Sequence, residues 1–119
     1  WKYENYNGSY LGGLVYDVST CGAKNGHVED AGPVTITQTG NTSMTIVTQQ
    51  IQVGTCTYSG DYSQLGHLGD LVGAFACADG SRGTFHAFEM EKTDSGMSGR
   101  YVAQEGQCVS AGRFGGLLR

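Results

Sequence analysis

Glu89 and Glu91 are the two residues whose type and spacing come closest to a catalytic pattern. They are two positions apart in an expected strand, so both face the same side of it, with Cβ atoms about 7 Å apart. Sugar hydrolysis uses two carboxyl groups at comparable separations as acid and base. Acidic residues near a strand end are, however, usually part of its solvated face. We therefore expect no catalytic role for this pair and predict a protein that is not an enzyme.

His27, His67 and His86 are the strongest candidates for metal ligands. His27 falls in an expected long loop, His67 at a hairpin tip and His86 within a strand, so the spacing places no two of them on one face. A metal site needs several such side chains converging on one point. We predict no metal ion and no cofactor. The chain also contains no Gly-x-Ser-x-Gly and no Gly-x-Gly sequence, which argues against serine-hydrolase and nucleotide chemistry.

A short motif, glycine followed two residues later by tyrosine or phenylalanine, recurs along the chain. It occurs as Gly8/Tyr10, Gly60/Tyr62, Gly73/Phe75, Gly83/Phe85, Gly99/Tyr101 and Gly112/Phe114. Residues two apart in a strand share a face, so each ring has an empty site beside it, as in strongly coiled small barrels. These rings either fill the core or line an interior pocket or its mouth. The candidate set is Tyr10, Tyr58, Tyr62, Phe75, Phe85, Tyr101 and Phe114.

Short alternating segments separated by turn residues must position these rings. We expect strands over residues 7–18, 34–38, 43–50, 55–64, 68–78, 82–92, 97–104 and 107–115, with one long loop over 20–32. The turns between them carry the Gly, Asn or Asp of tight hairpins, so consecutive strands are antiparallel neighbours. The sequence predicts one all-β domain over 1–119, an antiparallel up-and-down barrel of about eight strands. A β-sandwich is the alternative.

Four cysteines, Cys21, Cys56, Cys77 and Cys108, are widely spaced, with no Cys-x-x-Cys pair. Such spacing in a small domain favours two disulfides formed in an oxidising compartment. A hairpin turning near residues 66 and 67 would bring Cys56 opposite Cys77, and barrel closure would bring Cys21 near Cys108. The two other pairings, 21–56 with 77–108 and 21–77 with 56–108, stay open. We expect a secreted, periplasmic or cell-surface protein.

Composition excludes several classes of partner. The net charge is −4 and the seven basic residues are scattered, whereas a nucleic-acid site needs a clustered basic face. No apolar run approaches the roughly 18 residues of a membrane-spanning helix. The chain contains twenty glycines, and each glycine within a helix costs about 1 kcal/mol relative to alanine. We therefore expect no long helices. We expect neither nucleic acid nor a membrane span.

The second half of the sequence resembles a group of uncharacterised, Gly/Tyr-rich exported bacterial proteins. The resemblance covers about the last 60 residues and is carried by Cys56-Thr-Tyr-Ser-Gly-Asp-Tyr, Gly69-Asp-Leu-Val-Gly-Ala-Phe-Ala-Cys-Ala-Asp-Gly, Gly83-Thr-Phe-His-Ala-Phe-Glu-Met-Glu and Gly112-Arg-Phe-Gly-Gly. It implies export and cysteine pairing, but no activity for any residue. A looser likeness to avidin-type and lipocalin-type barrels lies in strand count and hairpin order and implies no ligand.

These observations predict an exported, non-catalytic binding module. Small barrels bind through shape, and aromatic side chains supply large contact areas at low entropic cost. The partner would be a small molecule or the surface of another molecule. The alternative, suggested by low charge and by the Gly and Tyr content, is a self-assembling structural subunit of an extracellular polymer, filament or surface layer.

Overall fold

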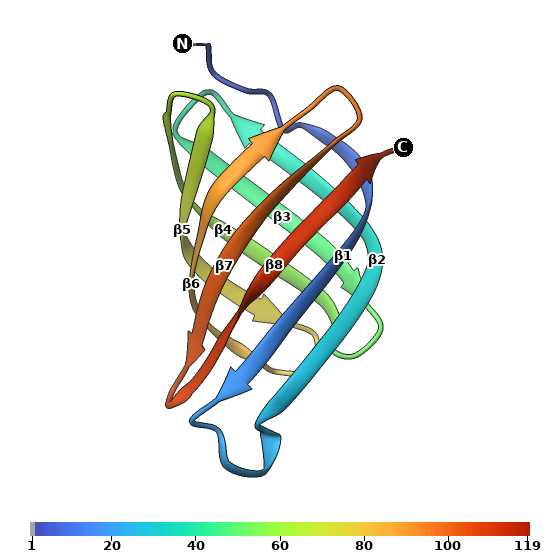
Figure 1. Ribbon diagram of the computed structural model, residues 1–119, viewed down its shortest axis with the longest axis vertical. Helices are drawn as coiled ribbons and strands as arrows, with labels where there is room; N and C mark the ends of the chain where they lie inside the picture. Colours follow the sequence, from blue (N-terminus) through green and yellow to red (C-terminus); the bar gives the residue numbers. More distant parts are fainter. Residues whose placement is uncertain (1) are drawn as a thin grey trace.

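Eight antiparallel strands close into a barrel in the order β1 to β8, as Figure 1 shows for the computed structural model. The structure describes residues 2–119. The elements are β1 (Gly8–Ser19), η1 (Gly22–Lys24), β2 (Gly26–Thr39), β3 (Ser43–Gln50), β4 (Gly54–Leu65), β5 (Leu68–Cys77), β6 (Arg82–Lys92), β7 (Gly96–Glu105) and β8 (Cys108–Leu118). The predicted up-and-down barrel is confirmed, and the β-sandwich alternative is not the fold.

Pairing between β1 and β8 closes the sheet. The register runs from Tyr10 opposite Leu118 to Ser19 opposite Val109. Each strand therefore has a neighbour on both sides, and the longest stretch that pairs on one side alone is residues 26–33 of β2, with β1. Closure thus removes most of the exposed edge through which open sheets aggregate.

Paired glycines let β4 and β5 approach closely at the centre of their hairpin. Gly60 lies directly opposite Gly73 in the β4–β5 register. A Cβ atom at Gly73 would overlap the carbonyl oxygen of Ser59, and one at Gly60 would overlap that of Val72. Glycine is thus required here by the backbone of the neighbouring strand, which explains why the Gly-x-aromatic motif occurs on strongly coiled strands.

Strand β2 corrects the expected long loop over residues 20–32. It begins at Gly26 and pairs with β1 from Val18 opposite Gly26 to Gly8 opposite Ile36. Gly32 and Pro33 suggested a break in the chain. Pro33 is tolerated because β2 pairs with β3 only from Val34 onward, so the missing N–H of the proline falls where that ladder ends.

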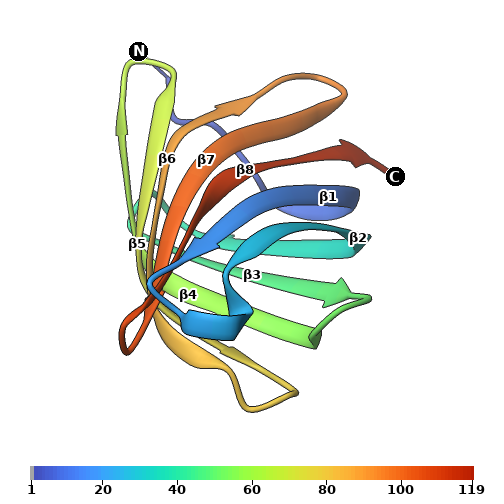
Figure 2. The ribbon, with the colours of Figure 1, turned by 60° about the horizontal axis from the view of Figure 1, so that its bottom comes forward.

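The two ends of the barrel differ. In the orientation of Figure 1, the upper end carries residues 2–7 and the β4–β5 hairpin, and the lower end carries the β1–β2 loop with η1. Figure 2 turns the lower end toward the viewer. Inward-facing side chains near the upper end, including Tyr10, Leu71 and Met90, are completely buried. Tyr6, from the segment before β1, is also completely buried and adds to this core.

No helix within residues 2–119 is long and apolar enough to cross a membrane.

Candidate ligand-binding cavity

The barrel interior contains a partly open cavity of about 70 Å³, which we call the inner cavity. Its wall is largely apolar and includes the rings of Tyr58, Phe85, Tyr101 and Phe114. Its polar residues, besides the two tyrosines, are three residues near the end of β3. The remaining lining residues are Gly12, Gly13, Leu14, Ala31, Gly32, Pro33, Val34, Ile46, Thr48, Gln49, Gln50, Ala87, Met97 and Gly115. A concave apolar wall with a few polar groups is the usual form of a small-molecule site.

The structure divides the seven candidate rings into two groups. Tyr10 and Tyr62 are buried in the upper core, away from the inner cavity. The other five form the aromatic part of the lower interior. Phe85 is buried there, and the half-buried rings that pack on the core are Tyr58, Phe75, Tyr101 and Phe114.

Ring-to-ring contacts organise this lower group. Tyr58 stacks on Phe75 with centroids 5.7 Å apart and meets the edge of Phe85 at 5.3 Å. On the opposite side, Tyr101 lies 6.2 Å from Phe114 and 6.2 Å from Tyr16. Offset and edge-to-face pairs of this kind hold rings in fixed orientations and contribute about 0.5–1.5 kcal/mol each beyond area burial.

Exposure increases toward the lower end of the barrel interior. Upper inward-facing side chains such as Ile36 and Met44 are 2% exposed, whereas Tyr16, Tyr58 and Tyr101 are half-buried although they also face inward. The inner cavity is therefore more accessible from the lower end than from the upper end.

A short chain of hydrogen bonds gives the inner cavity its polar side. Nε2 of Gln50 donates to the hydroxyl oxygen of Tyr58 at 3.2 Å and to Oγ1 of Thr48 at 2.7 Å. Thr48 and Gln50 share the inward face of β3 with Met44 and Ile46. The Tyr58 hydroxyl keeps its own hydrogen to donate, so a ligand acceptor could bind to it.

Burial keeps the tyrosine hydroxyls of this region protonated. It raises the pKa of Tyr16, Tyr58 and Tyr101 above their ordinary value of 10.0. For Tyr58 the hydrogen bond from Gln50 acts in the opposite direction but is the smaller effect. At neutral pH all three side chains are neutral phenols, and each can both donate and accept a hydrogen bond.

Sequence reasoning missed Tyr16, Thr48 and Gln50. Tyr16 lacks a glycine two residues before it, so the Gly-x-aromatic motif did not identify it. Its even separation from Tyr10 in one strand was the available signal. Thr48 and Gln50 are likewise separated by even numbers of residues from Met44 and Ile46, the apolar inward residues of β3. Polar residues are mostly exposed in proteins, so this spacing did not mark them as interior residues.

Both disulfides lie toward the lower end. They join Cys21 to Cys108 and Cys56 to Cys77, as the barrel register predicted, and residues 2–119 contain no free cysteine. The first links the β1–β2 loop to the start of β8, and the second joins directly opposed residues of β4 and β5. Together they brace two sides of the end from which the inner cavity is more accessible.

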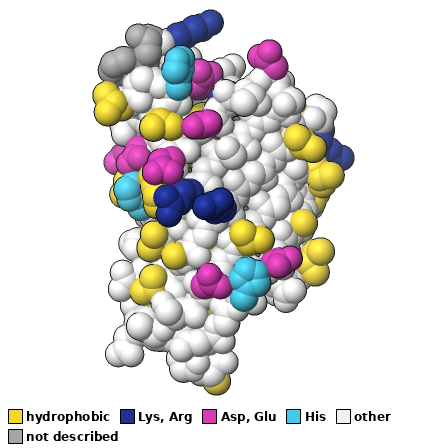
Figure 3. All heavy atoms as spheres, in the orientation of Figure 1, with side chains coloured by type: hydrophobic (Ala, Val, Ile, Leu, Met, Phe, Trp, Pro, Cys, Tyr) yellow, Lys and Arg dark blue, Asp and Glu magenta, His cyan; other side chains and the backbone are white. Residues whose placement is uncertain are grey.

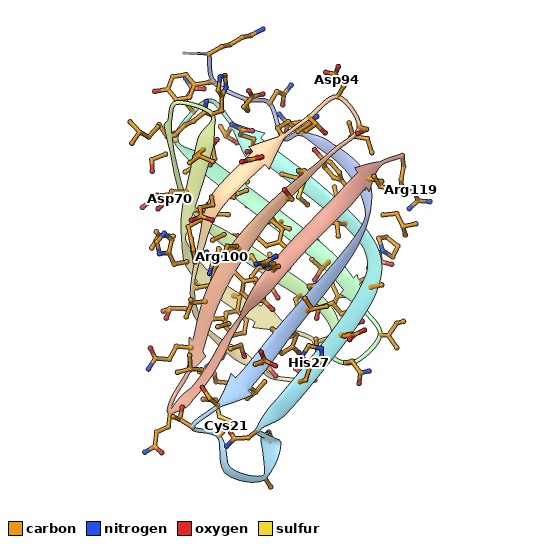
Figure 4. The ribbon with its side chains drawn as sticks, viewed as in Figure 1. Cys21, His27, Asp70, Asp94, Arg100 and Arg119 are labelled. Atoms are coloured by element: carbon orange, nitrogen blue, oxygen red, sulfur yellow. A yellow bond between two sulfur atoms is a disulfide. The ribbon has the colours of Figure 1, made fainter. Side chains whose placement is uncertain are left out.

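The glutamates considered for catalysis are both exposed on the outside of the barrel. Glu89 occupies an irregularity in β6, where the register shifts between Phe88 and Glu91, and its φ of 52° is unusual for a residue other than glycine. Its Oε2 atom lies 3.5 Å from Nη1 of Arg100, which Figure 4 labels on β7. Because neither glutamate lines the inner cavity, the two carboxylates do not act on a molecule bound there.

The histidines also lie outside the inner cavity. His27 is on β2 and not in the expected loop, with Nδ1 2.9 Å from Asp17 Oδ1 and Nε2 3.1 Å from Glu29 Oε2. His86 Nε2 lies 2.6 Å from Asp70 Oδ2. Figure 4 labels His27 and Asp70 on different parts of the barrel. In the part of the chain that is described, no group of three or more His, Cys, Asp or Glu side chains could hold a metal ion.

The face seen in Figure 3 carries charges of both signs, with hydrophobic side chains scattered between them. This mixed surface contrasts with the largely apolar wall of the inner cavity. Comparisons of the chain with protein-family models, with curated proteins and with solved structures gave no significant match.

Proposed function

We propose that the protein is an exported, non-catalytic module that binds a small molecule in the inner cavity. The observation that carries this proposal is the combination of four aromatic rings with the Gln50–Thr48–Tyr58 hydrogen-bond chain around one concave space. The rings would contact the apolar part of a ligand, and the Tyr58 hydroxyl would hydrogen-bond to one polar group.

The size of the inner cavity limits the ligand. At about 70 Å³ it is smaller than the roughly 150 Å³ in which an engineered cavity of another protein binds benzene. A fully enclosed ligand would have only a few non-hydrogen atoms. A larger ligand would insert one compact group and extend past Tyr16 and Tyr101 toward the lower end, where these side chains are half-buried.

Two disulfides support the proposed export. They form and persist in oxidising compartments, such as the bacterial periplasm or the outside of the cell. The resemblance of residues after Cys56 to exported bacterial proteins agrees with this proposal. The alternative role as a polymer subunit has less support, because closure of β1 to β8 into a barrel leaves residues 26–33 of β2 as the longest stretch without a partner strand on one side.

A cavity-filling variant tests the binding function. Ala87 is 3% exposed and lines the inner cavity, so Ala87→Leu adds apolar volume directly into it. Ala74 is exposed on β5 and does not line that cavity, which makes Ala74→Leu the matched control. A panel of small molecules would be screened by ligand-observed NMR. It would contain compounds of a few non-hydrogen atoms, such as acetone and isopropanol, and larger compounds that carry a comparably small apolar group.

We expect at least one panel member to bind native protein and Ala74→Leu with similar affinity, and to bind Ala87→Leu at least about tenfold more weakly. Near-UV circular dichroism would show whether each variant keeps its packed core. Failure of the whole panel to bind, or unchanged binding to a correctly folded Ala87→Leu, would overturn the proposal. If Ala87→Leu does not fold, Ala87→Val takes its place.

A further inference from the structure

Residues 2–7 lie in extended form at the upper end of the barrel and are held there through their backbone. The N–H of Glu4 donates to Oε1 of Gln64 at 3.0 Å, and Nε2 of Gln64 donates to the carbonyl oxygen of Lys2 at 2.7 Å. The N–H of Tyr6 donates to Oε1 of Gln38 at 2.8 Å, and Nε2 of Gln38 donates to the carbonyl oxygen of Glu4 at 3.1 Å.

These four bonds have the pattern of a parallel β-ladder. In such a ladder one residue accepts from an N–H of the partner strand through its C=O, and through its own N–H donates to the carbonyl two residues earlier on that strand. The side-chain amides of Gln64 and Gln38 take the place of such partner residues. The Gln64 amide bonds to the backbone on both sides of residue 3, and the Gln38 amide bonds to the backbone on both sides of residue 5. Recognition through the backbone tolerates different side chains at these positions.

Tyr6 supplies the side-chain specificity of this arrangement. Its ring is completely buried and meets the ring of Tyr62 edge-to-face, with centroids 5.8 Å apart. Its carbonyl oxygen accepts a hydrogen bond from the Tyr10 hydroxyl at 2.7 Å. The Tyr62 hydroxyl also donates to Oε1 of Gln64 at 2.8 Å, which fixes the orientation of that amide.

We propose that the upper end is a peptide-binding site for an extended segment with an aromatic anchor, and that its partner in trans is the same segment of a second copy of this chain. Residues 2–7 are then its intramolecular occupant. The backbone and ring contacts described above connect the segment to barrel residues, so a segment from another molecule can make them equally well. Such exchange of an identical element is a low-cost route to association.

The connection between the segment and the barrel permits this exchange. Gly8, at the start of β1, has φ of 152°, in the range that favours glycine, and so provides a point where the chain direction can change. An attached segment has an effective concentration in the millimolar range. We therefore expect the native chain to keep its own segment bound at micromolar protein concentrations.

Two variants separate the site from its occupant. In Tyr6→Ala the segment loses its anchor while Gln38, Gln64 and Tyr62 remain in place, so this variant serves as the acceptor. In Gln38→Ala/Gln64→Ala the site is broken while the segment remains intact, so this variant serves as the donor. Near-UV circular dichroism and thiol titration would show that both keep the barrel and the disulfides. If the double variant does not fold, Gln38→Ala serves as donor.

The first measurement uses a peptide with the sequence of residues 2–7, Lys-Tyr-Glu-Asn-Tyr-Asn, with blocked ends. It would be titrated into Tyr6→Ala while the side-chain amide signals of Gln38 and Gln64 are followed by NMR. We expect binding at least about tenfold tighter than for the same peptide with alanine in place of its second tyrosine. No binding, or equal binding of the two peptides, would overturn the peptide site.

The second measurement mixes the two variants. Each alone should sediment as a monomer, and the mixture should form a complex of one donor and one acceptor. If the peptide binds to the acceptor but the mixture stays monomeric, the second copy is not the partner and that part of the proposal is overturned. Both measurements are independent of the inner cavity, so their outcome does not affect the proposed small-molecule function.

Discussion

Gln50 and Tyr58 are joined inside the barrel by a hydrogen bond of 3.2 Å, although they belong to different strands. The amide of Gln50 is buried, and its other contact, with Thr48, fixes the position of its Nε2 atom. The Tyr58 hydroxyl is therefore held in one place on the wall of the inner cavity. A fixed polar group in an apolar space determines how a bound ligand is oriented.

Replacing Tyr58 by Phe tests this contact. The change removes the hydroxyl and keeps the ring, so we expect the free energy of unfolding to fall by about 1 kcal/mol. Tyr101→Phe is the matched control, because within residues 2–119 the structure gives the Tyr101 hydroxyl no hydrogen-bond partner, and we expect a change below about 0.5 kcal/mol. Urea denaturation measures both. Equal effects would show that the Gln50 contact does not stabilise the barrel.

The two disulfides should contribute unequally to stability. Cys21 and Cys108 are 87 residues apart, and Cys56 and Cys77 are 21 residues apart. In the chain-entropy description, these loops correspond to about 4.5 and about 3.3 kcal/mol. We therefore expect Cys21→Ser/Cys108→Ser to lower the free energy of unfolding more than Cys56→Ser/Cys77→Ser. Guanidinium denaturation of the two double variants would show the order, and the reverse order would contradict this prediction.

His27 should make stability depend on pH. Hydrogen bonds to Asp17 and Glu29 raise the pKa of His27 above its ordinary value of 6.5. A raised pKa in the folded state adds stability that is fully present below the unfolded-state pKa and is lost as pH rises through the folded-state pKa. The loss of stability in His27→Gln, relative to native protein, should therefore be larger at about pH 5 than at about pH 8.

An NMR titration of the His27 ring provides the direct check. The variant Asp17→Asn/Glu29→Gln removes both carboxylates and should lower the measured pKa of His27 relative to that in the native protein. An unchanged pKa would show that these neighbours do not stabilise the imidazolium form.

Gly73 should not tolerate a side chain. A Cβ atom there would overlap the carbonyl oxygen of Ser59 on the paired strand, so β4 and β5 would have to separate. We expect Gly73→Ala to lower the free energy of unfolding by about 1–3 kcal/mol. Gly115→Ala is the control, because its Cβ would meet its nearest atom, the carbonyl oxygen of Met97, at an ordinary 3.5 Å. Similar melting temperatures for the two variants would contradict this explanation.

Local patterns in the sequence were sufficient to predict most of the barrel. Tight turns with Gly, Asn or Asp and the alternation of the strands are short-range features, and they also determine the Cys56–Cys77 pairing. The lower half of β2 was missed because its Gly32-Pro33 pair normally ends a strand. What permits this strand is the position of Pro33 beyond the end of the β2–β3 ladder, a tertiary relationship with no local signal.

The polar residues of both proposed sites could not be identified from sequence patterns either. Gln50, Gln38 and Gln64 are ordinary polar residues in a chain rich in them. Gln38 and Gln64 bond to the segment before β1, 32 or more positions earlier, and the bond from Gln50 to Tyr58 depends on the pairing of β3 with β4. Gln64 contacts Lys2 and Glu4, which are 62 and 60 positions earlier in the chain. The aromatic motif, in contrast, named a set of rings without separating those that line the inner cavity, such as Phe85, from those in the upper core, such as Tyr62.

The two ends of this barrel are held by different kinds of bond, and they should therefore respond to different agents. Disulfides brace the end near Cys21, so a thiol reductant would loosen the route toward the inner cavity and leave the other end in place. The segment around Tyr6 is held without covalent bonds, so a competing peptide would displace it while the cystines stay intact. We therefore expect reductant to act on the lower end and competing peptide to act on the upper end, each without disturbing the other.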